Sequence, residues 1–381
     1  MPEPSLTLVT GFWLQKHELV RTAAVYVRLF EELVRHVDNA APIVCCIDPR
    51  VEALVRGVAE RNPHARLLLQ PMPFEALRYG GDLGRFDDMQ PANGSLSIRD
   101  TIEYTAIVWS KPATVATVAA ENPFRTSHLA WIDFGMPHVV ELADVDWREV
   151  IAEATRTDRV RFCERMATAA HEVEDAFYFY SNNSARVCGG LLTGTPKGFV
   201  ELAELFEIEI ARMVPTGTYA LEEQVLAAIC AKHPNLFDRW YADYYGLLKN
   251  IRHVRRDVDT VLANLTHCRE ESLWTDGVEI ARLLLDSGSA YVRFEPEQCF
   301  HLLDAGLACA VHTDRELADH LGRTVLALYH HSRVGRGMMK GKWRRSLQAS
   351  LQAIDLDFPQ KPWSWEEMCA QPQFPTWMAC F

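Results

Sequence analysis

Short apolar runs and longer stretches of helical periodicity alternate along the first part of the chain. The apolar runs lie at Leu6–Phe12, 42–48 and 65–70, and each predicts a buried strand. The stretches between them, 18–37 and 50–61, carry apolar residues every three or four positions and predict helices. This order of strand, helix, strand, helix, strand predicts parallel strands with helices packed on both faces of a sheet.

The pattern continues less regularly to about residue 250. Residues 71–97 are rich in Gly, Pro and Asp and predict an irregular segment. Further strands are predicted at 129–134, 177–179 and 189–192, and further helices at 98–120, 199–214 and 219–232.

After residue 255 the pattern is almost wholly helical. We therefore expect an α/β domain over residues 1–255, with a mixed Rossmann-type sheet flanked by helices. An α-helical region over 256–356 follows, and residues 357–381 form a tail rich in Pro and Trp.

The charge of the chain limits its partners. It contains 39 Lys and Arg against 51 Asp and Glu, a formal net charge of −12. This balance argues against non-specific coating of nucleic acid, which needs a basic surface. One local exception is the segment 333–345, which holds six cationic residues. It is either a solvated helix end or a dock for an anionic partner such as a phosphorylated glycan, a membrane surface or a nucleic acid.

Cysteine usage and hydropathy point to the cytoplasm. The ten cysteines are scattered without a CxxC pair, which indicates reduced thiols and gives no zinc pattern. The N-terminus lacks the basic and apolar regions of a signal peptide, and no apolar stretch approaches about 18 residues. We expect a cytoplasmic protein that reaches any membrane-linked substrate from the side, at the periphery of the inner membrane.

The sharpest chemical motif is the run from Trp131 to Gly135, WIDFG. A carboxylate at the end of a strand lies where open α/β sheets bind ligands, and Asp133 could hold a divalent metal that bridges a diphosphate. Gly135 lets the backbone approach a ligand closely. Lys111, on the preceding helix, could neutralise phosphate oxygens. The alternatives are that Asp133 only forms a turn and that Lys111 is a solvated surface lysine.

Three later features could complete a site. Gly189 and Gly190 open a glycine-rich run that allows close approach of a ligand. Glu222, Glu223 and Gln224 begin a helix, where carboxylates either favour the positive helix end or act as a base or a binder of sugar hydroxyls. The aromatic segment 241–245 contains Tyr244, which either packs in the fold or stacks on a base or sugar.

The order of these blocks resembles a known family. Residues 8–12 (LVTGF), 109–112 (WSKP), 122–124 (NPF), 131–135 (WIDFG), 189–190 (GG), 222–224 (EEQ) and 241–244 (YADY) follow each other as in the HtrL/YibB family, over roughly residues 5–255. That family is associated with loci for lipopolysaccharide and other bacterial surface glycans, and is regarded as glycosyltransferase-like. More distantly, the order is similar to GT-A enzymes of the glycogenin and galactosyltransferase kind.

The resemblance assigns roles to residues of this chain. It implies that the donor site comprises Thr10, Gly11, Phe12, Lys111, Asp133 and Gly135, with the first three framing the nucleotide. It implies that Glu223 and Gln224 face the sugar. We also expect Gly189, Gly190 and Tyr244 to lie toward the acceptor. Glu222 or Glu223 would be the base of an inverting reaction, and a retaining reaction needs none at that face.

One departure from the GT-A pattern concerns the metal. Two carboxylates are usual in the acidic motif that binds Mn²⁺, and here Asp133 is the single one. Either Asp243 or His253 completes the metal shell, or metal binding is weaker or absent.

We expect a glycosyltransferase that moves a sugar from a nucleotide-diphosphate donor to a glycan or another hydroxyl acceptor. One alternative is an inactive GT-A-like protein that binds glycans or acts as a scaffold. Another is a nucleic-acid-modifying enzyme that uses the 333–345 segment.

Overall fold

The computed structural model describes residues 5–15, 22–92, 101–182, 185–288, 294–331 and 343–356. The chain divides into two compact units, Met1–Glu164 with Thr168–Arg252, and Arg165–Ala167 with His253–Phe381. This division falls three residues before the end of the predicted α/β domain at residue 255. The predicted tail, 357–381, and most of the basic segment 333–345 lie outside the described residues.

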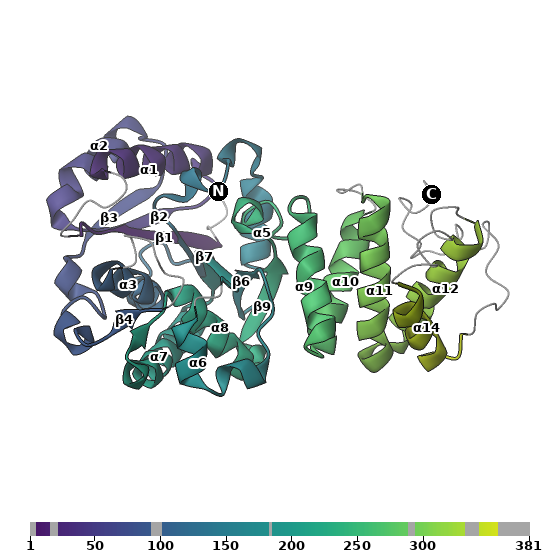
Figure 1. The fold of residues 1–381 in the computed structure, drawn as a ribbon. Helices are drawn as coiled ribbons and strands as arrows, with labels where there is room; N and C mark the ends of the chain where they lie inside the picture. Colours follow the sequence, from purple (N-terminus) through teal and green to yellow (C-terminus); the bar gives the residue numbers. More distant parts are fainter. Residues whose placement is uncertain are drawn as a thin grey trace. The chain divides into compact units, whose positions relative to one another are not determined.

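A seven-stranded sheet forms the centre of the first unit, in the order β3-β2-β1-β5-β7-β6-β9 (Figure 1). The strands are β1 (Leu6–Phe12), β2 (Ile43–Ile47), β3 (Leu67–Pro71), β5 (His128–Ile132), β6 (Val160–Glu164), β7 (Val187–Gly194) and β9 (Phe237–Tyr241). Strand β7 pairs antiparallel with both β5 and β6, whereas the other pairs in this sheet are parallel. The predicted mixed sheet is therefore confirmed. Strands β4 (Gln90–Pro91) and β8 (Thr218–Tyr219) pair separately.

Alternating side chains of the strands feed two hydrophobic cores, one on each face of the sheet. Along β5, Leu129 and Trp131 belong to one core, and Ala130 and Ile132 belong to the other. This is the two-residue period of a strand buried on both faces. It explains why these strands appear in the sequence as continuous apolar runs.

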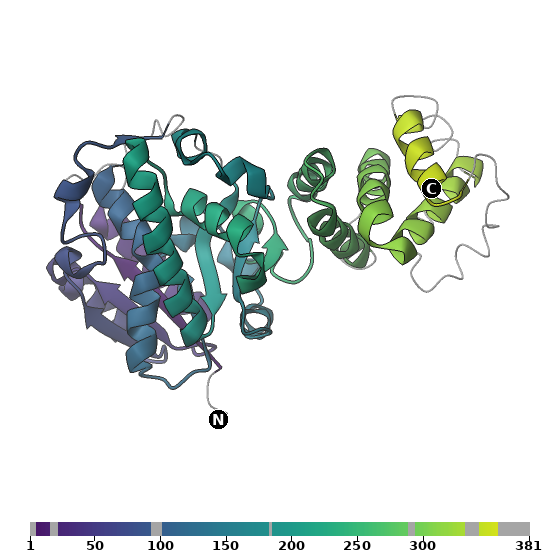
Figure 2. The same ribbon diagram turned by 90° about the horizontal axis from the view of Figure 1, so that it is seen from below.

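Helices cover both faces of the sheet (Figures 1 and 2). One face is covered by α1 (Ala23–Val37), α2 (Glu52–Arg61) and α5 (Trp147–Ala154), whose buried residues belong to one core. The other is covered by α3 (Ile102–Trp109), α4 (Lys111–Glu121), α7 (Pro196–Met213) and α8 (Glu222–Lys232). Blue and teal helices of this second group lie in front of the strands in Figure 2.

Helices α3 and α4 are almost one helix, joined at Ser110. Ser110 keeps helical dihedral angles, and Thr114 N donates to its carbonyl oxygen at 2.8 Å. Pro112 has no N–H to donate, which accounts for the break in the assignment at this joint. The predicted single helix over 98–120 is therefore close to the observed pair, and residues 104 and 111 lie two turns apart on one side of it.

Several elements differ from the sequence-based expectation. The aromatic run 177–179 was expected to be a strand but lies in the helix α6 (Ala176–Ser181), and this prediction is wrong. Asp175 caps that helix by accepting from Tyr178 N, and Tyr178 faces solvent. Phe177 is also exposed, whereas Phe179 is buried, so the aromatic run lies on a capped helix with one solvent-facing side. Strands β6 and β9 were not predicted.

The second unit is helical, as predicted for this region. It comprises α9 (Val258–Glu270), α10 (Trp274–Gly288), α11 (Pro296–Thr313), α12 (Arg315–His331) and α14 (Trp343–Ala353). Helix α11 is central, since it packs against all four others. Gly277 allows the close approach of α10 and α11, because a Cβ there would meet the Cys309 side chain.

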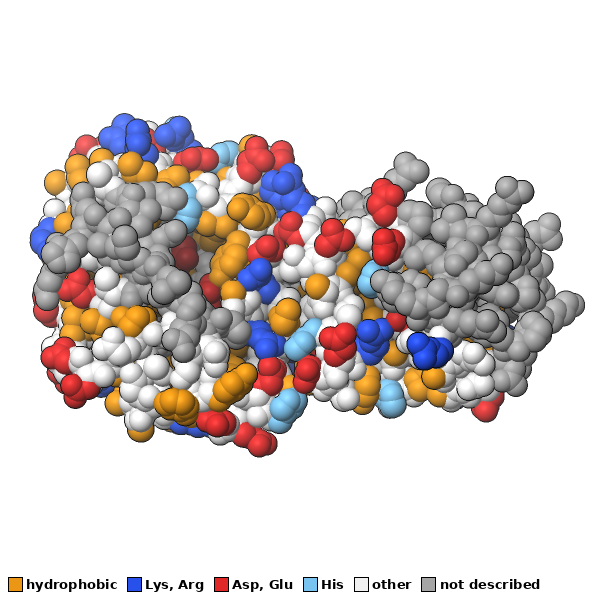
Figure 3. Space-filling model, in the orientation of Figure 1, with side chains coloured by type: hydrophobic (Ala, Val, Ile, Leu, Met, Phe, Trp, Pro, Cys, Tyr) orange, Lys and Arg blue, Asp and Glu red, His pale blue; other side chains and the backbone are white. Residues whose placement is uncertain are grey.

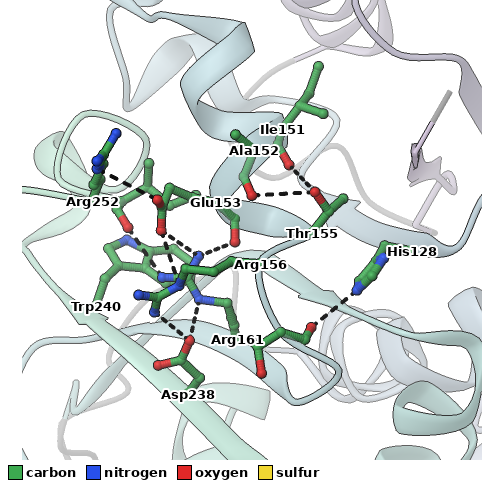
Figure 4. Close-up of polar contacts among 12 residues, drawn as sticks. His128, Ile151, Ala152, Glu153, Thr155, Arg156, Arg161, Asp238, Trp240 and Arg252 are labelled. Carbon is green, nitrogen blue, oxygen red and sulfur yellow. Dashed lines mark hydrogen bonds and ion pairs between the residues drawn. The ribbon is translucent and has the colours of Figure 1, made fainter. Parts of the chain in front are cut away.

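A buried arginine lies at the end of the sheet opposite the carboxyl ends of β5 and β6 (Figure 4). Arg161 on β6 is 1% exposed and pairs in register with Asp238 on β9, with Nε 2.9 Å from Asp238 Oδ2. It also donates to the Ile251 carbonyl oxygen at 3.3 Å and lies over the Trp240 ring. Its second carboxylate partner is Glu153. This network holds the end of the first unit against the sheet.

Acidic, basic and apolar side chains are interspersed over the face drawn in Figure 3. None of the helices in the described part of the chain is both long and apolar enough to cross a lipid bilayer.

Candidate active site

The acidic motif at Asp133 and the glycine motif at 189–190, which are distant in sequence, meet at one edge of the sheet. Asp133 directly follows β5, and β7, which runs antiparallel, begins at the same edge. Asp133 N donates to the Gly190 carbonyl oxygen at 3.0 Å. The carboxyl ends of parallel strands are where open α/β sheets bind ligands.

The Asp133 side chain is held by the indole two residues earlier. By the alternation along β5, residues 131 and 133 face the same side, toward α4. Trp131 Nε1 donates to Asp133 Oδ1 at 2.7 Å. The Asp133 side chain is nonetheless 41% exposed. The carboxylate is therefore oriented by the protein and open to a ligand.

Lys111, at the start of α4, connects three elements at this edge. Its Nζ lies 2.9 Å from Asp133 Oδ1 and 2.6 Å from Glu222 Oε1, and it donates to the Gly189 carbonyl oxygen at 3.1 Å. The residue is 4% exposed, so it is not the solvated surface lysine of the alternative interpretation. Burial alone would lower the pKa of Lys111, but Asp133 and Glu222 raise it well above its usual value.

The neighbouring carboxylates at the start of α8 have different surroundings. Glu222 is buried against Lys111. Glu223 accepts from Gly189 N at 3.0 Å, and its two oxygens accept from Tyr244 OH at 2.6 and 2.7 Å. Desolvation, and then the charge of Glu222, raises the pKa of Glu223 to about 7. Glu222 is therefore neutralised by a cation, whereas Glu223 can exchange a proton near neutral pH.

Glycine is required where β7 meets these carboxylates. A Cβ on Gly189 would clash with Glu222 Oε1 and lie 3.1 Å from Glu223 Cγ. A Cβ on Gly190 would lie 3.0 Å from Met136 Cε. The predicted glycine-rich run is thus the start of a buried strand, and its glycines admit protein carboxylates beside the backbone.

One residue of this cluster was missed from the sequence. Burial raises the pKa of the Tyr104 phenol, and the charges of Glu222 and Asp133 raise it further. Tyr104 is seven residues before Lys111 on the nearly continuous α3–α4 helix. Since long helical side chains lean toward the N-terminus, Lys111 leans toward Tyr104. The seven-residue spacing between Tyr104 and Lys111 was the signal in the sequence that could have identified Tyr104.

The predicted nucleotide-framing residues lie on the adjacent strand. Val9 of β1 pairs with Trp131, so the residues after it run toward the same edge as Asp133. Thr10 is fully buried, which leaves Gly11 and Phe12 with surface to face a ligand. The Phe12 ring stacks on Phe134 at 4.9 Å between centroids. Contact with a nucleotide stays a prediction for these residues.

Two other predicted residues have structural partners. Gln224 is buried, and its amide donates to the carbonyl oxygens of Phe179 and Asn182 at 2.9 and 3.1 Å. Its side chain therefore ties α8 to α6 rather than joining the Lys111 cluster. Gly135 is buried, and a Cβ there would lie 3.1 Å from the Tyr26 ring.

The predicted metal ligands do not form one group. Asp243 accepts from Tyr244 N at 2.7 Å, and His253 belongs to the second unit. In the described ranges, no three His, Cys, Asp or Glu side chains gather as a metal site. Asp133 Oδ1 already accepts from Trp131 Nε1 and is paired with the Lys111 ammonium.

The charge of the cluster nevertheless favours a cation. Lys111 carries one positive charge, and it lies beside the carboxylates of Asp133 and Glu222. Glu223 adds a third negative charge when it is ionised. An unaccompanied diphosphate would be repelled here. Asp133 is the residue that would hold a divalent ion bound to a diphosphate, because its carboxylate is 41% exposed.

Comparison with known proteins supports the resemblance read from the sequence. Residues 92–253 match the family described as "Bacterial protein of unknown function (HtrL_YibB)", which confirms the predicted resemblance over that range. No curated protein sequence matches the chain. Among solved structures, the chain is similar to mouse xyloside xylosyltransferase 1 in its apo form, with a TM-score of 0.37 and 11% identity. That similarity covers 61% of this chain and 83% of the other.

Proposed function

We propose that this chain is a glycosyltransferase that moves a sugar from a nucleotide-diphosphate donor to a hydroxyl acceptor. The observation that carries the proposal is the pair of unlike carboxylates at the ligand-binding edge of the sheet. Glu222 is neutralised by Lys111, whereas Glu223 lies with Tyr244 and Gly189 and has a pKa near neutrality. A carboxyl group with a pKa raised toward neutrality is typical of acid–base sites.

The chemistry would use these groups as follows. The acceptor oxygen attacks the anomeric carbon, and the bond from that carbon to the diphosphate oxygen breaks with its electron pair leaving on the diphosphate. The acceptor proton passes to ionised Glu223, the base of an inverting transfer. A divalent ion at Asp133 would offset charge on the leaving diphosphate. Tyr244 keeps the Glu223 carboxylate in place.

The family match supports a bacterial setting for this reaction. Together with the resemblance to proteins of surface-glycan loci, it favours a glycan acceptor in the biosynthesis of lipopolysaccharide or another surface polysaccharide. In this proposal the enzyme works in the cytoplasm or at the face of the inner membrane.

Thermal unfolding with nucleoside diphosphates and sugar nucleotides, with and without Mn²⁺, tests the proposal. A ligand at a hundred times its dissociation constant stabilises the fold by about 2.7 kcal/mol, which shifts the unfolding midpoint of a domain of about 250 residues by about 5 °C. We expect a shift for one nucleotide base that needs Mn²⁺ and is lost in Asp133→Asn. The absence of a shift with every nucleotide would contradict the proposal.

One observation favours a second candidate function. Asp133 is a single carboxylate, and its Oδ1 already accepts from Trp131 and approaches Lys111. An inactive GT-A-like protein that binds glycans would keep such an edge without using it for transfer. Binding of oligosaccharides by the wild type, together with no hydrolysis of any sugar nucleotide, would support this candidate.

A further inference from the structure

The Lys111 ammonium is buried among three oxygen atoms of the protein. A lysine ammonium carries three N–H donors and no acceptor. Lys111 donates to Glu222 Oε1 at 2.6 Å and to the Gly189 carbonyl oxygen at 3.1 Å, and it forms an ion pair with Asp133 Oδ1 at 2.9 Å. The residue is 4% exposed, so these protein groups surround the ammonium. A donor phosphate could therefore bind Lys111 only by displacing one of these partners.

The three partners come from separate elements of the first unit. Glu222 begins α8, Asp133 follows β5 and Gly189 lies near the start of β7. Lys111 itself begins α4 and lies 5.9 Å from the centre of the Trp131 ring. One buried cation thus fixes the relative positions of two strand ends and a helix start.

The glycine at 189 makes this arrangement possible. A Cβ there would displace Glu222 Oε1, the atom closest to Lys111 Nζ. The Gly189 backbone serves both sides of the cluster, since its carbonyl accepts from Lys111 and its N–H donates to Glu223. A movement of Lys111 would therefore reach Glu223 through the backbone of one residue.

We propose that Lys111 is a positioning residue, which orients Asp133, Glu222 and the Gly189 peptide instead of binding the donor diphosphate. This inference rests on the proposed function and reassigns a residue that the resemblance places in the donor site. It leaves Asp133 and Glu223 as the groups that face the ligands.

The test uses a double variant that keeps the local net charge. Lys111→Met with Glu222→Met removes one positive and one negative charge, so a change in anion affinity reports a lost contact. Methionine is unbranched, and replacing a buried ion pair with apolar side chains is often tolerated. The probe is inorganic pyrophosphate with Mn²⁺, measured by calorimetry on the full chain.

We expect the double variant to bind pyrophosphate within about threefold of the wild type, while sugar transfer falls at least about a hundredfold. Lys111→Arg should recover little transfer, because a planar guanidinium does not match the three partners of an ammonium. A loss of pyrophosphate affinity of about tenfold or more would overturn the inference, since one charged hydrogen bond contributes about that factor.

A second measurement separates this inference from the proposed function. If the wild type binds neither pyrophosphate nor any nucleotide, the proposed function fails, but the positioning role can still be judged. Unfolding midpoints of Lys111→Met, Asp133→Asn and the variant with both changes form a double-mutant cycle. Non-additive midpoints support the positioning role, and additive midpoints would overturn it.

Discussion

The Lys111 ammonium and the Glu222 carboxylate, 111 residues apart in the chain, meet at 2.6 Å with both side chains almost fully buried. This contact distinguishes two adjacent glutamates that the sequence leaves equivalent. Glu222 pairs with Lys111, whereas burial raises the pKa of Glu223 to about 7, so Glu223 can change its protonation state near neutral pH.

The protonation of Glu223 should be visible in the pH dependence of stability. The folded pKa of about 7 lies above the usual value of 4.5, so the fold favours the protonated form. The stability that this provides is complete below about pH 4.5 and is lost as pH rises through about 7. Relative to Glu223→Gln, the wild type should lose about 1–3 kcal/mol over this range, measured by denaturant unfolding.

Activity should follow the opposite course, because the base must be ionised. We expect wild-type transfer to rise with pH through about 7 and Glu223→Gln to be slower by about 10²–10⁴. If the difference in stability between the wild type and Glu223→Gln does not change between about pH 4.5 and 7, the raised pKa of Glu223 is contradicted.

Tyr244 should lower the pKa of Glu223, because its hydroxyl donates to both carboxylate oxygens. Tyr244→Phe removes that donor, so the rise of activity should move to higher pH. Tyr245→Phe is the matched control, since Tyr245 is the next residue and is exposed to solvent. Equal pH profiles for the two variants would argue against the role of Tyr244.

Gly189 should tolerate no side chain. Gly189→Ala places a Cβ against Glu222 Oε1, so we expect destabilisation by about 1–3 kcal/mol and a loss of activity. Gly194→Ala lies in the same strand, where the nearest atoms to a Cβ are 3.4 Å away, and should be milder. Thermal unfolding and transfer assays compare the two, and equal effects would contradict the account of the Lys111 cluster.

The arginine network at the opposite end of the sheet should matter for stability alone. Arg161→Met leaves Glu153 and Asp238 with fewer positive partners, so we expect a loss of about 3–5 kcal/mol. Arg156→Met is the control, since Arg156 is 53% exposed and should cost at most about 1 kcal/mol. Denaturant unfolding compares them, and a mild Arg161→Met would contradict a buried role for this network.

The periodicity of the sequence predicts much of this fold because most strands are buried on both faces. Strands β1, β2, β3 and β5 appear as apolar runs close to their observed bounds. Strand β6 was missed because its sequence, VRFCE, contains Arg161 and Glu164, which are buried through ion pairs. Charge pairing across strands cannot be read from one segment alone.

The candidate site was predictable in its parts but not in its connections. Asp133, Lys111 and the 222–223 pair were identified from local motifs, and the structure brings them together. The separate roles of Glu222 and Glu223 depend on which of them reaches Lys111, and this follows from the tertiary packing. The same packing turns Gln224 toward α6, which its position in the EEQ motif does not reveal.

The most direct measurement is the release of nucleoside diphosphate from a panel of sugar nucleotides, with Mn²⁺ and without acceptor, by the wild type and Asp133→Asn. We expect the wild type to hydrolyse one sugar nucleotide slowly, and Asp133→Asn to be at least about a hundredfold slower with an unchanged fold. Failure of the wild type to release diphosphate from any sugar nucleotide, or near-wild-type release by Asp133→Asn, would contradict a glycosyltransferase site at this edge of the sheet.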